Sequence, residues 1–384
     1  MPWKEVSMVA QRREFVALAG SAGVPVAELC RRFGISRDTG HRLLREHAER
    51  GEAALRPRSR RPHASPTRTE AAMEQAVLGL LERHPAWGGR KLARRLRDMG
   101  LAGVPAPSTI TAILRRHDRL GPGMAAGQRP WQRFERAAPN ELWQMDFKGH
   151  VALRQGRCHP LTVIDDHCRY ALALRACADE AEATVRGQLT ALFRRYGLPQ
   201  AMLCDNGPPW GATGHATADG RRVFTRLEVW LMRHGIATHH GRPYHPQTQG
   251  KDERFHRTLD IEVLQMRQPM ADLPTAQAHF DAWRDVYNHE RPHEALELDT
   301  PASRYRCSPV RFCETPPEPL YDRTDLTRRV RRDGSISFHG RYHPISQGFA
   351  GQTIALRPTT TDGLWDVRFS HFPIAQLDLR IAQA

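Results

Sequence analysis

The stretch Glu-Leu-Trp-Gln-Met-Asp-Phe-Lys at residues 141–148 marks the point where this 384-residue chain changes from helical patterns to alternating strands and helices. Its apolar and polar side chains alternate, which is the period of a β-strand. The aromatic and methionine side chains fall on one face, and Asp146 falls on the other. Asp146 is therefore a candidate functional residue, and the segments around it decide which fold carries it.

The segments that follow predict further strands and helices of one domain. Their boundaries are marked by changes of period or by Gly, Pro and capping residues. The predicted strands are residues 161–165, 170–175, 201–205 and 236–239, and the predicted helices are residues 180–196, 222–234 and 246–266. Three strands, a helix, a strand, a helix, a strand and more helices is the order of a ribonuclease-H-like domain, with a mixed sheet and helices on its faces.

The N-terminal part predicts an all-α helix-turn-helix module. Helical periods at residues 8–19 and 26–33 are followed by a glycine-containing turn and by Ser36, a natural N-cap for a helix through His47. Helix, turn and capped helix is the helix-turn-helix pattern. The candidate DNA-binding residues on the last helix are Arg37, Thr39, His41, Arg42 and Arg45.

A second helical module follows, of the helix-turn-helix or winged-helix kind. Its predicted helices are residues 70–83, 89–99 and 108–117, the last of them capped by Ser108. The middle helix places basic residues around an apolar stripe. Its candidate DNA contacts are Arg90, Lys91 and Arg94.

From about residue 321 the chain is rich in β signals, which favour a small C-terminal β-barrel. The predicted organisation is as follows: residues 1–54 a helix-turn-helix domain, 55–68 a basic linker, 69–120 a second helical domain, 121–135 a linker, 136–300 the catalytic core, 301–320 a linker and 321–384 the barrel.

The charge balance predicts a polyanionic partner. The formal net charge is +15 and the sequence pI is about 10.2. The chain shows no apolar run that could span a bilayer and no signal peptide at its start, so nucleic acid is favoured over a membrane. Seven cysteines without a CxxC pair indicate reduced thiols in a cytosol. A zinc site at Cys158, His159, His167 and Cys168 is the alternative, but these residues bracket a predicted strand and are interpreted as strand-edge residues.

Two further acids have informative positions. Asp205 ends a buried strand just before the turn at residues 206–209, and Glu253 lies in the helix that begins at Pro246. A strand, the end of a neighbouring strand and a packed helix can bring three acids to one sheet edge. Cleaving a phosphodiester with two Mg²⁺ ions requires hard oxygen ligands of this kind. Adjacent Asp252 is expected to point about 100° round the helix, away from the site.

The residues flanking these acids resemble a known family. Residues 136–149, 204–207 and 241–254 resemble the three acid-bearing blocks of bacterial insertion-sequence transposases of the retroviral-integrase type, and residues 287–293 with Thr300 and Pro301 resemble the segment that closes their core. Asp205 and Glu253 stand 48 positions apart, a longer gap than in many members of the wider group, and the surplus is placed at residues 210–220.

The resemblance implies an enzyme that cuts and joins DNA. It implies that Asp146, Asp205 and Glu253 bind two Mg²⁺ ions, with Mn²⁺ as a substitute. It also implies that the partners are terminal inverted repeats and target duplex, that subunits assemble on DNA, and that the enzyme is cytoplasmic and associated with the bacterial nucleoid.

Further candidates and alternatives complete this interpretation. Lys148 and Lys251 each stand two positions from a predicted triad acid, and they and Arg254 are candidate DNA contacts. Asp165 and Asp166 are rival ligands that we interpret as a supporting turn pair. The alternative functions are a ribonuclease-H-like nuclease without strand transfer and a catalytically inactive DNA-binding regulator.

Overall fold

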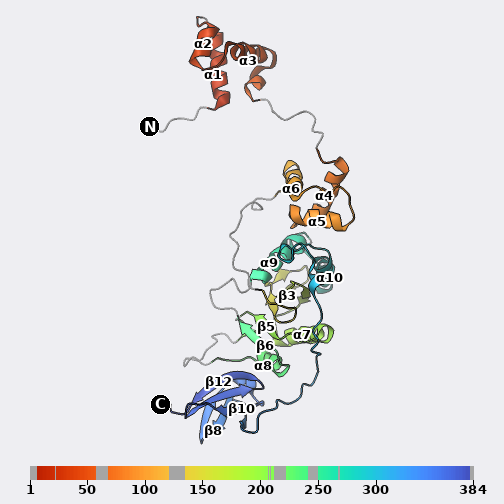
Figure 1. Cartoon of the computed structure of the whole chain (residues 1–384), viewed down its shortest axis with the longest axis vertical. Helices are drawn as coiled ribbons and strands as arrows, with labels where there is room; N and C mark the ends of the chain where they lie inside the picture. Colours follow the sequence, from red (N-terminus) through yellow and green to blue (C-terminus); the bar gives the residue numbers. More distant parts are fainter. Residues whose placement is uncertain are drawn as a thin grey trace. The chain divides into compact units, whose positions relative to one another are not determined.

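The structure is a computed structural model. It describes residues 7–21, 23–57, 68–120, 135–205, 207, 209–211, 222–240, 250–266 and 269–380. The chain divides into two compact units, residues 1–68 and 69–384 (Figure 1).

The first unit confirms the predicted helix-turn-helix. Its elements are α1 (Met8–Gly20), α2 (Val26–Arg32), α3 (Arg37–Arg50) and a 3-10 turn, η1 (Gly51–Leu55). The N-cap is Ser36, whose hydroxyl accepts a hydrogen bond of 3.2 Å from the Thr39 amide. The helices close around buried Phe15 and Leu29, and Gly40 of α3 packs so tightly that a Cβ there would lie 2.4 Å from the Cys30 sulfur.

The second unit begins with three more helices, α4 (Ala71–Arg83), α5 (Gly89–Asp98) and α6 (Pro107–Arg116). Their common core includes Trp87, which is fully buried. The predicted cap at Ser108 is wrong. The helix begins one residue earlier, at Pro107, because a proline at the first helical position lacks only an N–H that would have no partner there.

A six-stranded mixed sheet forms the centre of this unit. Its strands are β1 (Trp143–Phe147), β2 (Val151–Ala152), β3 (Arg157–Asp165), β4 (Ala171–Cys177), β5 (Ala201–Cys204) and β6 (Ala237–His240). The order is β2-β3-β1-β5-β6, with β4 also paired to β3. The first strands pair antiparallel, whereas β1, β5 and β6 are parallel. The predicted mixed sheet is therefore confirmed.

Helices cover both faces of the sheet (Figure 1). One face packs on α7 (Glu182–Tyr196) and α8 (Arg226–Arg233), and the other on α9 (Gly250–Leu259) and α10 (Leu273–His289). A π-helical turn, η3 (Asp260–Leu264), follows α9, and η4 (Glu294–Leu296) and α11 (Pro301–Arg304) follow α10. The predicted start of the α9 helix at Pro246 lies outside the described residues, and α8 begins four residues later than residue 222, after a capping box formed by Thr225 and Glu228.

The C-terminal part is a β-domain, but its strand pairing is not that of a closed barrel. The strands are β7 (Leu326–Arg329), β8 (Ser335–Phe338), β9 (Arg341–Pro344), β10 (Thr353–Pro358), β11 (Leu364–Phe369) and β12 (Phe372–Asp378), with a 3-10 turn, η5 (Gln347–Phe349). Among the described residues they form a four-stranded sheet, β12-β11-β10-β7, and a separate β8-β9 hairpin. The prediction of C-terminal β-structure was correct, but closure into a barrel depends on pairing between distant strands, which local patterns do not encode.

This β-domain shares a hydrophobic core with the central domain. Phe224, Val229 and Met232, at and within α8, pack in one cluster with the buried side chains of the C-terminal strands. The hydroxyl of Ser346 bonds to both the amide and the carbonyl of Phe224, at 3.0 and 3.1 Å. A Cβ at Gly348 would lie 2.3 Å from the same carbonyl oxygen, so only glycine permits this approach.

The segment 301–320, which we expected to be a linker, is bound along the central domain. The amide of Ser308 bonds to the Tyr196 carbonyl and the amide of Leu198 to the Val310 carbonyl, both at 2.8 Å. Gly197 makes room for this pairing, since a Cβ there would lie 2.7 Å from the Val310 oxygen. Further along, Glu318 forms an ion pair of 2.9 Å with Arg233.

Candidate active site

Two of the predicted acids lie on neighbouring parallel strands. Asp146 belongs to β1, and Asp205 directly follows β5. In the register of the two strands, Gln144 lies opposite Leu203, so two residues further on Asp205 comes opposite Asp146. Neighbouring strands are roughly 4.8 Å apart and opposed residues of parallel strands share a face. The fold therefore brings these two carboxyl groups together at one sheet edge.

The electrostatics of Asp146 reflect this arrangement. Its side chain is 24% exposed. The pKa of Asp146 is raised from 3.8 to about 7, chiefly by burial, then by the negative charge of Asp205, with smaller contributions from Glu180 and Glu253. Like charges held near one another disfavour the ionised form of each group. A raised pKa is therefore usual in a cluster of carboxylates that has no cation bound.

The third acid, Glu253, lies in the first turn of α9 and is exposed. The opposite side of this turn is buried and packs through Phe255 onto the sheet. Glu253 lies close enough to add to the field on Asp146. Within the described ranges, however, no three His, Cys, Asp or Glu side chains converge closely enough to enclose one ion.

Asp252 corrects one expectation. Instead of pointing away, it is only 1% exposed, and burial together with the charges of Asp146 and Asp166 raises the pKa of its carboxyl group well above 3.8. Its Oδ1 is buried without a hydrogen-bond partner. A buried oxygen without a partner beside several like charges suits a hard divalent cation such as Mg²⁺, so the residues present fit such a group.

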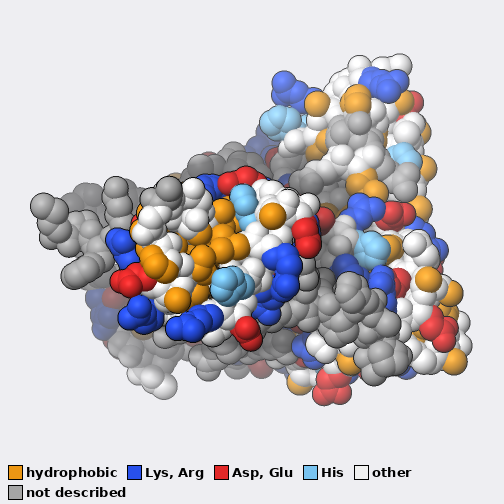
Figure 2. Space-filling view, turned by 90° about the horizontal axis from the view of Figure 1, so that it is seen from above, with side chains coloured by type: hydrophobic (Ala, Val, Ile, Leu, Met, Phe, Trp, Pro, Cys, Tyr) orange, Lys and Arg blue, Asp and Glu red, His pale blue; other side chains and the backbone are white. Residues whose placement is uncertain are grey.

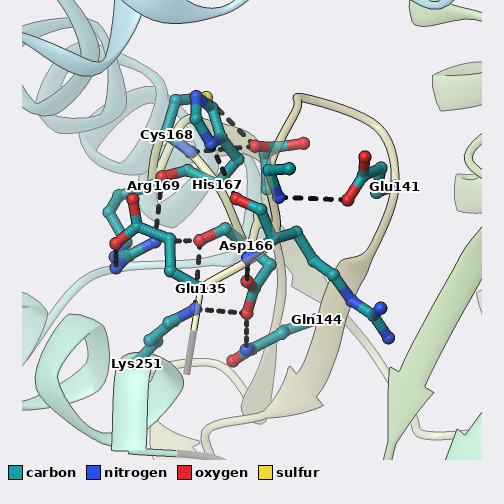
Figure 3. Close-up of polar contacts among 11 residues, drawn as sticks. Glu135, Glu141, Gln144, Asp166, His167, Cys168, Arg169 and Lys251 are labelled. Atoms are coloured by element: carbon teal, nitrogen blue, oxygen red, sulfur yellow. Dashed lines mark hydrogen bonds and ion pairs between the residues drawn. The ribbon is translucent and has the colours of Figure 1, made fainter. Parts of the chain in front are cut away.

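A hydrogen-bond network joins α9 to the hairpin between β3 and β4 (Figure 3). Its centre is Asp166, which is fully buried. One of its carboxylate oxygens accepts from Gln144 at 2.6 Å and from the ammonium group of Lys251, and the other accepts from the Arg136 amide at 2.9 Å. Lys251 also bonds to the Asp166 carbonyl at 3.1 Å. Because Lys251 is two residues from Glu253, the network fixes the start of the helix that carries Glu253.

The neighbouring Asp165 supports the same hairpin. Its two oxygens accept from the amides of Asn140 and Cys168, at 2.7 and 3.0 Å. The carboxylates of both acids of the turn accept hydrogen bonds from protein donors, which is consistent with their interpretation as a supporting pair.

The predicted lysine contacts are both engaged within the protein. Lys251 binds Asp166, and Lys148 forms an ion pair of 3.0 Å with Asp260. Arg254 is exposed on α9. Each lysine thus connects α9 or η3 to the sheet, a role that its spacing from the acids did not indicate.

The sequence patterns did not single out Thr162 and His256, a hydrogen-bonded pair that reaches the main chain of Asp146 through Thr162. The Thr162 hydroxyl donates to the Asp146 carbonyl at 3.0 Å and lies 2.9 Å from His256 Nε2. Burial, followed by the charge of Lys148, lowers the pKa of His256 to about 4, so its ring is neutral at pH 7 and donates to Thr162. The only sequence signal was the position of His256, three residues after Glu253 on the same helix.

The candidate DNA-binding residues fall into two groups. On α3, Arg37, His41, Arg42 and Arg45 are exposed, whereas the Thr39 hydroxyl is 2.9 Å from that of Ser36 and belongs to the cap. Figure 2 shows basic side chains interspersed with acidic and apolar ones on the face that it draws.

On α5 the predicted DNA contacts lie beside residues of the central domain. Arg90 lies 3.9 Å from Glu294 and Arg94 lies 3.4 Å from Asp299. Lys91 is largely buried, and burial followed by the charge of Arg291 lowers its pKa to about 7. These three residues join the second helical module to the chain around η4.

The zinc alternative finds no support in the geometry. Cys158 and Cys168 are buried in hydrophobic clusters on opposite faces of the sheet, so their sulfurs cannot converge on one ion. All seven cysteines are described and none forms a disulfide. None of the helices within the described ranges is long and apolar enough to cross a membrane.

Family models match nearly every part of the chain. Two models described as integrase core domain match residues 136–246 and 234–301, a homeodomain-like domain matches 39–114, a helix-turn-helix domain matches 11–63, and the C-terminal domain of the IS481 family transposases matches 325–384. The chain thus carries integrase core domains and a C-terminal domain of the IS481 transposase type, next to helix-turn-helix domains.

Individual relatives agree with this assignment. A 31.7 kDa protein of insertion element IS407 from Burkholderia multivorans is 26% identical over 293 residues, 74% of this chain and 92% of the relative. A protein of insertion element IS476 from Xanthomonas euvesicatoria is 26% identical over 73% of this chain and 78% of its own length. The Gag-Pol polyprotein of avian reticuloendotheliosis virus is 26% identical over 51% of this chain, but only 16% of the polyprotein is covered.

Several solved structures with similarity to this chain come from retroviruses. An integrase chain from a simian T-cell lymphotropic virus intasome is 12% identical, with a TM-score of 0.39, over 79% of this chain and 96% of that chain. The catalytic core of BIV integrase is 22% identical, with a TM-score of 0.32, over 43% of this chain and 92% of that chain.

Proposed function

We propose that this chain is a DNA transposase that binds the terminal inverted repeats of a mobile element, cleaves the DNA there and joins it to target DNA. The proposal rests above all on the opposition of Asp146 and Asp205 on neighbouring parallel strands, with Glu253 close enough to add to the field on Asp146. Two helix-turn-helix matches in the same chain fit an enzyme that must find defined DNA ends before it cuts.

Asp146, Asp205 and Glu253 would hold the metal ions in this proposal. Two Mg²⁺ ions, or Mn²⁺ in their place, supply activation of the attacking oxygen and stabilisation of the leaving 3′ oxygen when bound. The protein keeps the acids in position: strand pairing holds Asp146, and the Lys251–Asp166 contact holds the first turn of α9. Each acid must be ionised to act, and a bound cation offsets the burial and the repulsion by Asp205 that raise the pKa of Asp146.

End recognition is proposed for α3. A helix-turn-helix reads base edges with residues near the start of its second helix. Arg37, His41 and Arg42 are exposed there, and an arginine presents two donors that match guanine in the major groove. Other basic residues would contact the phosphates of the target DNA, because a phosphate contact needs positive charge but not alignment with particular bases.

We also propose that at least two copies act together on DNA, since both ends of an element must be joined in one event, and that they do so in the bacterial cytoplasm, on the nucleoid.

The test is a strand-transfer assay with matched terminal repeats. Asp146→Asn, Asp205→Asn and Glu253→Gln should each abolish cleavage and joining and leave repeat binding intact, because an amide is a poor ligand for paired metal ions. Near-normal joining by any one variant would remove that residue from the triad. Cleavage without joining by the wild type would favour the nuclease alternative, and binding without cleavage the regulator.

A further inference from the structure

A histidine lies at the end of β6, next to Asp205. β5 and β6 are parallel, and Cys204 lies opposite His240, the last residue of its strand. The side chain of His240 turns towards the end of β5, where its Nδ1 is 3.0 Å from the main-chain carbonyl oxygen of Asp205. A side chain thus adds one hydrogen bond beyond the point where main-chain pairing of the two strands ends.

The other ring nitrogen of His240 is held by a buried carboxylate. Its Nε2 is 2.9 Å from Oε1 of Glu228, whose side chain is 2% exposed. Each ring nitrogen lies at hydrogen-bond distance from an oxygen acceptor, a carbonyl on one side and a carboxylate on the other, so the imidazole has a fixed orientation.

Glu228 is itself fixed by its place in the fold. It is the third residue of α8, and its other oxygen accepts from the Thr225 amide at 2.7 Å in the capping box of that helix. Arg222 donates to Oε1 at 2.8 Å. The carboxylate is thus anchored to a helix terminus, and that anchor extends through His240 to Asp205.

We propose that His240, oriented by Glu228, is a positioning residue that fixes the main chain at Asp205 so that its carboxylate faces Asp146 and can bind a divalent cation. This rests on the proposed function, because it assigns the role through the acid that we propose as a metal ligand. Strand pairing holds Cys204, the residue before Asp205, and the His240 side chain holds the carbonyl group of Asp205. The rotation about the Cα–C bond of Asp205 is therefore restrained where the strand gives way to the following turn.

The experiment is Mn²⁺ binding to the full-length protein by titration calorimetry, without DNA. His240→Gln is expected to weaken Mn²⁺ binding by about 10–100-fold, the usual effect of removing a partner that orients a metal ligand. Glu228→Gln preserves the helix cap through its amide oxygen and should weaken binding in the same range. The double variant should bind Mn²⁺ no more weakly than the single variant of lower affinity, because both substitutions break the same chain of contacts.

His239→Gln is the matched control. This histidine is the neighbouring residue of β6 but is exposed, and its substitution should leave Mn²⁺ binding unchanged. An unchanged thermal midpoint for His240→Gln separates positioning from loss of folding. Glu228→Gln gives an independent reading if His240→Gln is unstable.

The outcomes are distinct. Wild-type affinity for Mn²⁺ in both His240→Gln and Glu228→Gln overturns the positioning role while leaving the triad intact. If the wild-type protein binds no Mn²⁺, or if the Asp205→Asn variant binds it with the same affinity as the wild type, the proposed metal site is refuted. The proposed role of His240 is then refuted as well.

Discussion

Asp146→Asn should make the protein more stable while removing its proposed activity. In the wild type the pKa of Asp146 is raised from 3.8 to about 7, mainly by burial and then by Asp205. Each unit of pKa corresponds to about 1.4 kcal/mol, so the ionised carboxylate costs the folded state up to about 4 kcal/mol. Because the side chain retains some contact with water, we expect the gain to be about 2–4 kcal/mol.

The pH dependence has a definite direction. The folded pKa lies above the unfolded one, so the cost is absent below about pH 4, grows as the pH rises, and is complete above about pH 7. The stability advantage of the variant should therefore be largest near pH 8 and vanish as the pH falls towards 4. Excess Mg²⁺ should stabilise the wild type but not the variant, because a ligand that binds only the folded state adds to its stability.

Chemical denaturation in the presence of a chelator measures this difference. Every described tryptophan belongs to the second unit, so the tryptophan emission of the described residues follows the domain that contains Asp146. Equal or lower stability of the variant near pH 8 would refute the account of Asp146 as a buried carboxylate that Asp205 also repels. So would an advantage that does not change with pH.

Three other perturbations test the remaining parts of the chain. Arg42→Ala should weaken binding to terminal-repeat DNA by about 1–3 kcal/mol and leave random duplex binding less affected, as measured by fluorescence anisotropy; an equal loss for both DNAs would make it a phosphate contact. Gly348→Ala should lower the stability of the second unit by about 1–3 kcal/mol in thermal denaturation, since its Cβ would meet the Phe224 carbonyl at 2.3 Å. Gly187→Ala, where nothing lies within 4 Å, is its matched control and should be neutral or stabilising. Gly40→Ala should destabilise the first unit through collision with a buried cysteine sulfur of α2, and wild-type unfolding by circular dichroism would contradict that packing.

The elements that sequence patterns predicted well are those set by local chemistry. Ser36 caps α3 because its hydroxyl reaches the Thr39 amide within one turn, and Asp146 falls on a strand because its neighbours alternate. The opposition of Asp205 to Asp146 needed only the order of strands in a ribonuclease-H-like sheet. Such features require no knowledge of distant contacts.

The features that were missed depend on residues far apart in the sequence. Arg94 of α5 contacts Asp299, more than two hundred residues away, and the local pattern of basic residues does not indicate this ion pair. The rotation of α9 is set by the packing of Phe255 and Leu259 on the sheet, and it turns Asp252 inward. His240 and Glu228 become partners only when β6 and α8 come together, and the capping box that contains Glu228 does not indicate that contact.

The shared core of α8 and the C-terminal strands bears on how this protein is made. Val229 and Met232 are translated about a hundred residues before the strands that bury them, so the outer face of α8 stays open on the growing chain until those strands have been made. An exposed apolar face on an incomplete chain is a binding site for chaperones and a start for aggregation. A chain that terminates before these strands would therefore be incompletely folded. We expect such a chain to be degraded by proteases instead of persisting as a folded core that competes with the full-length protein.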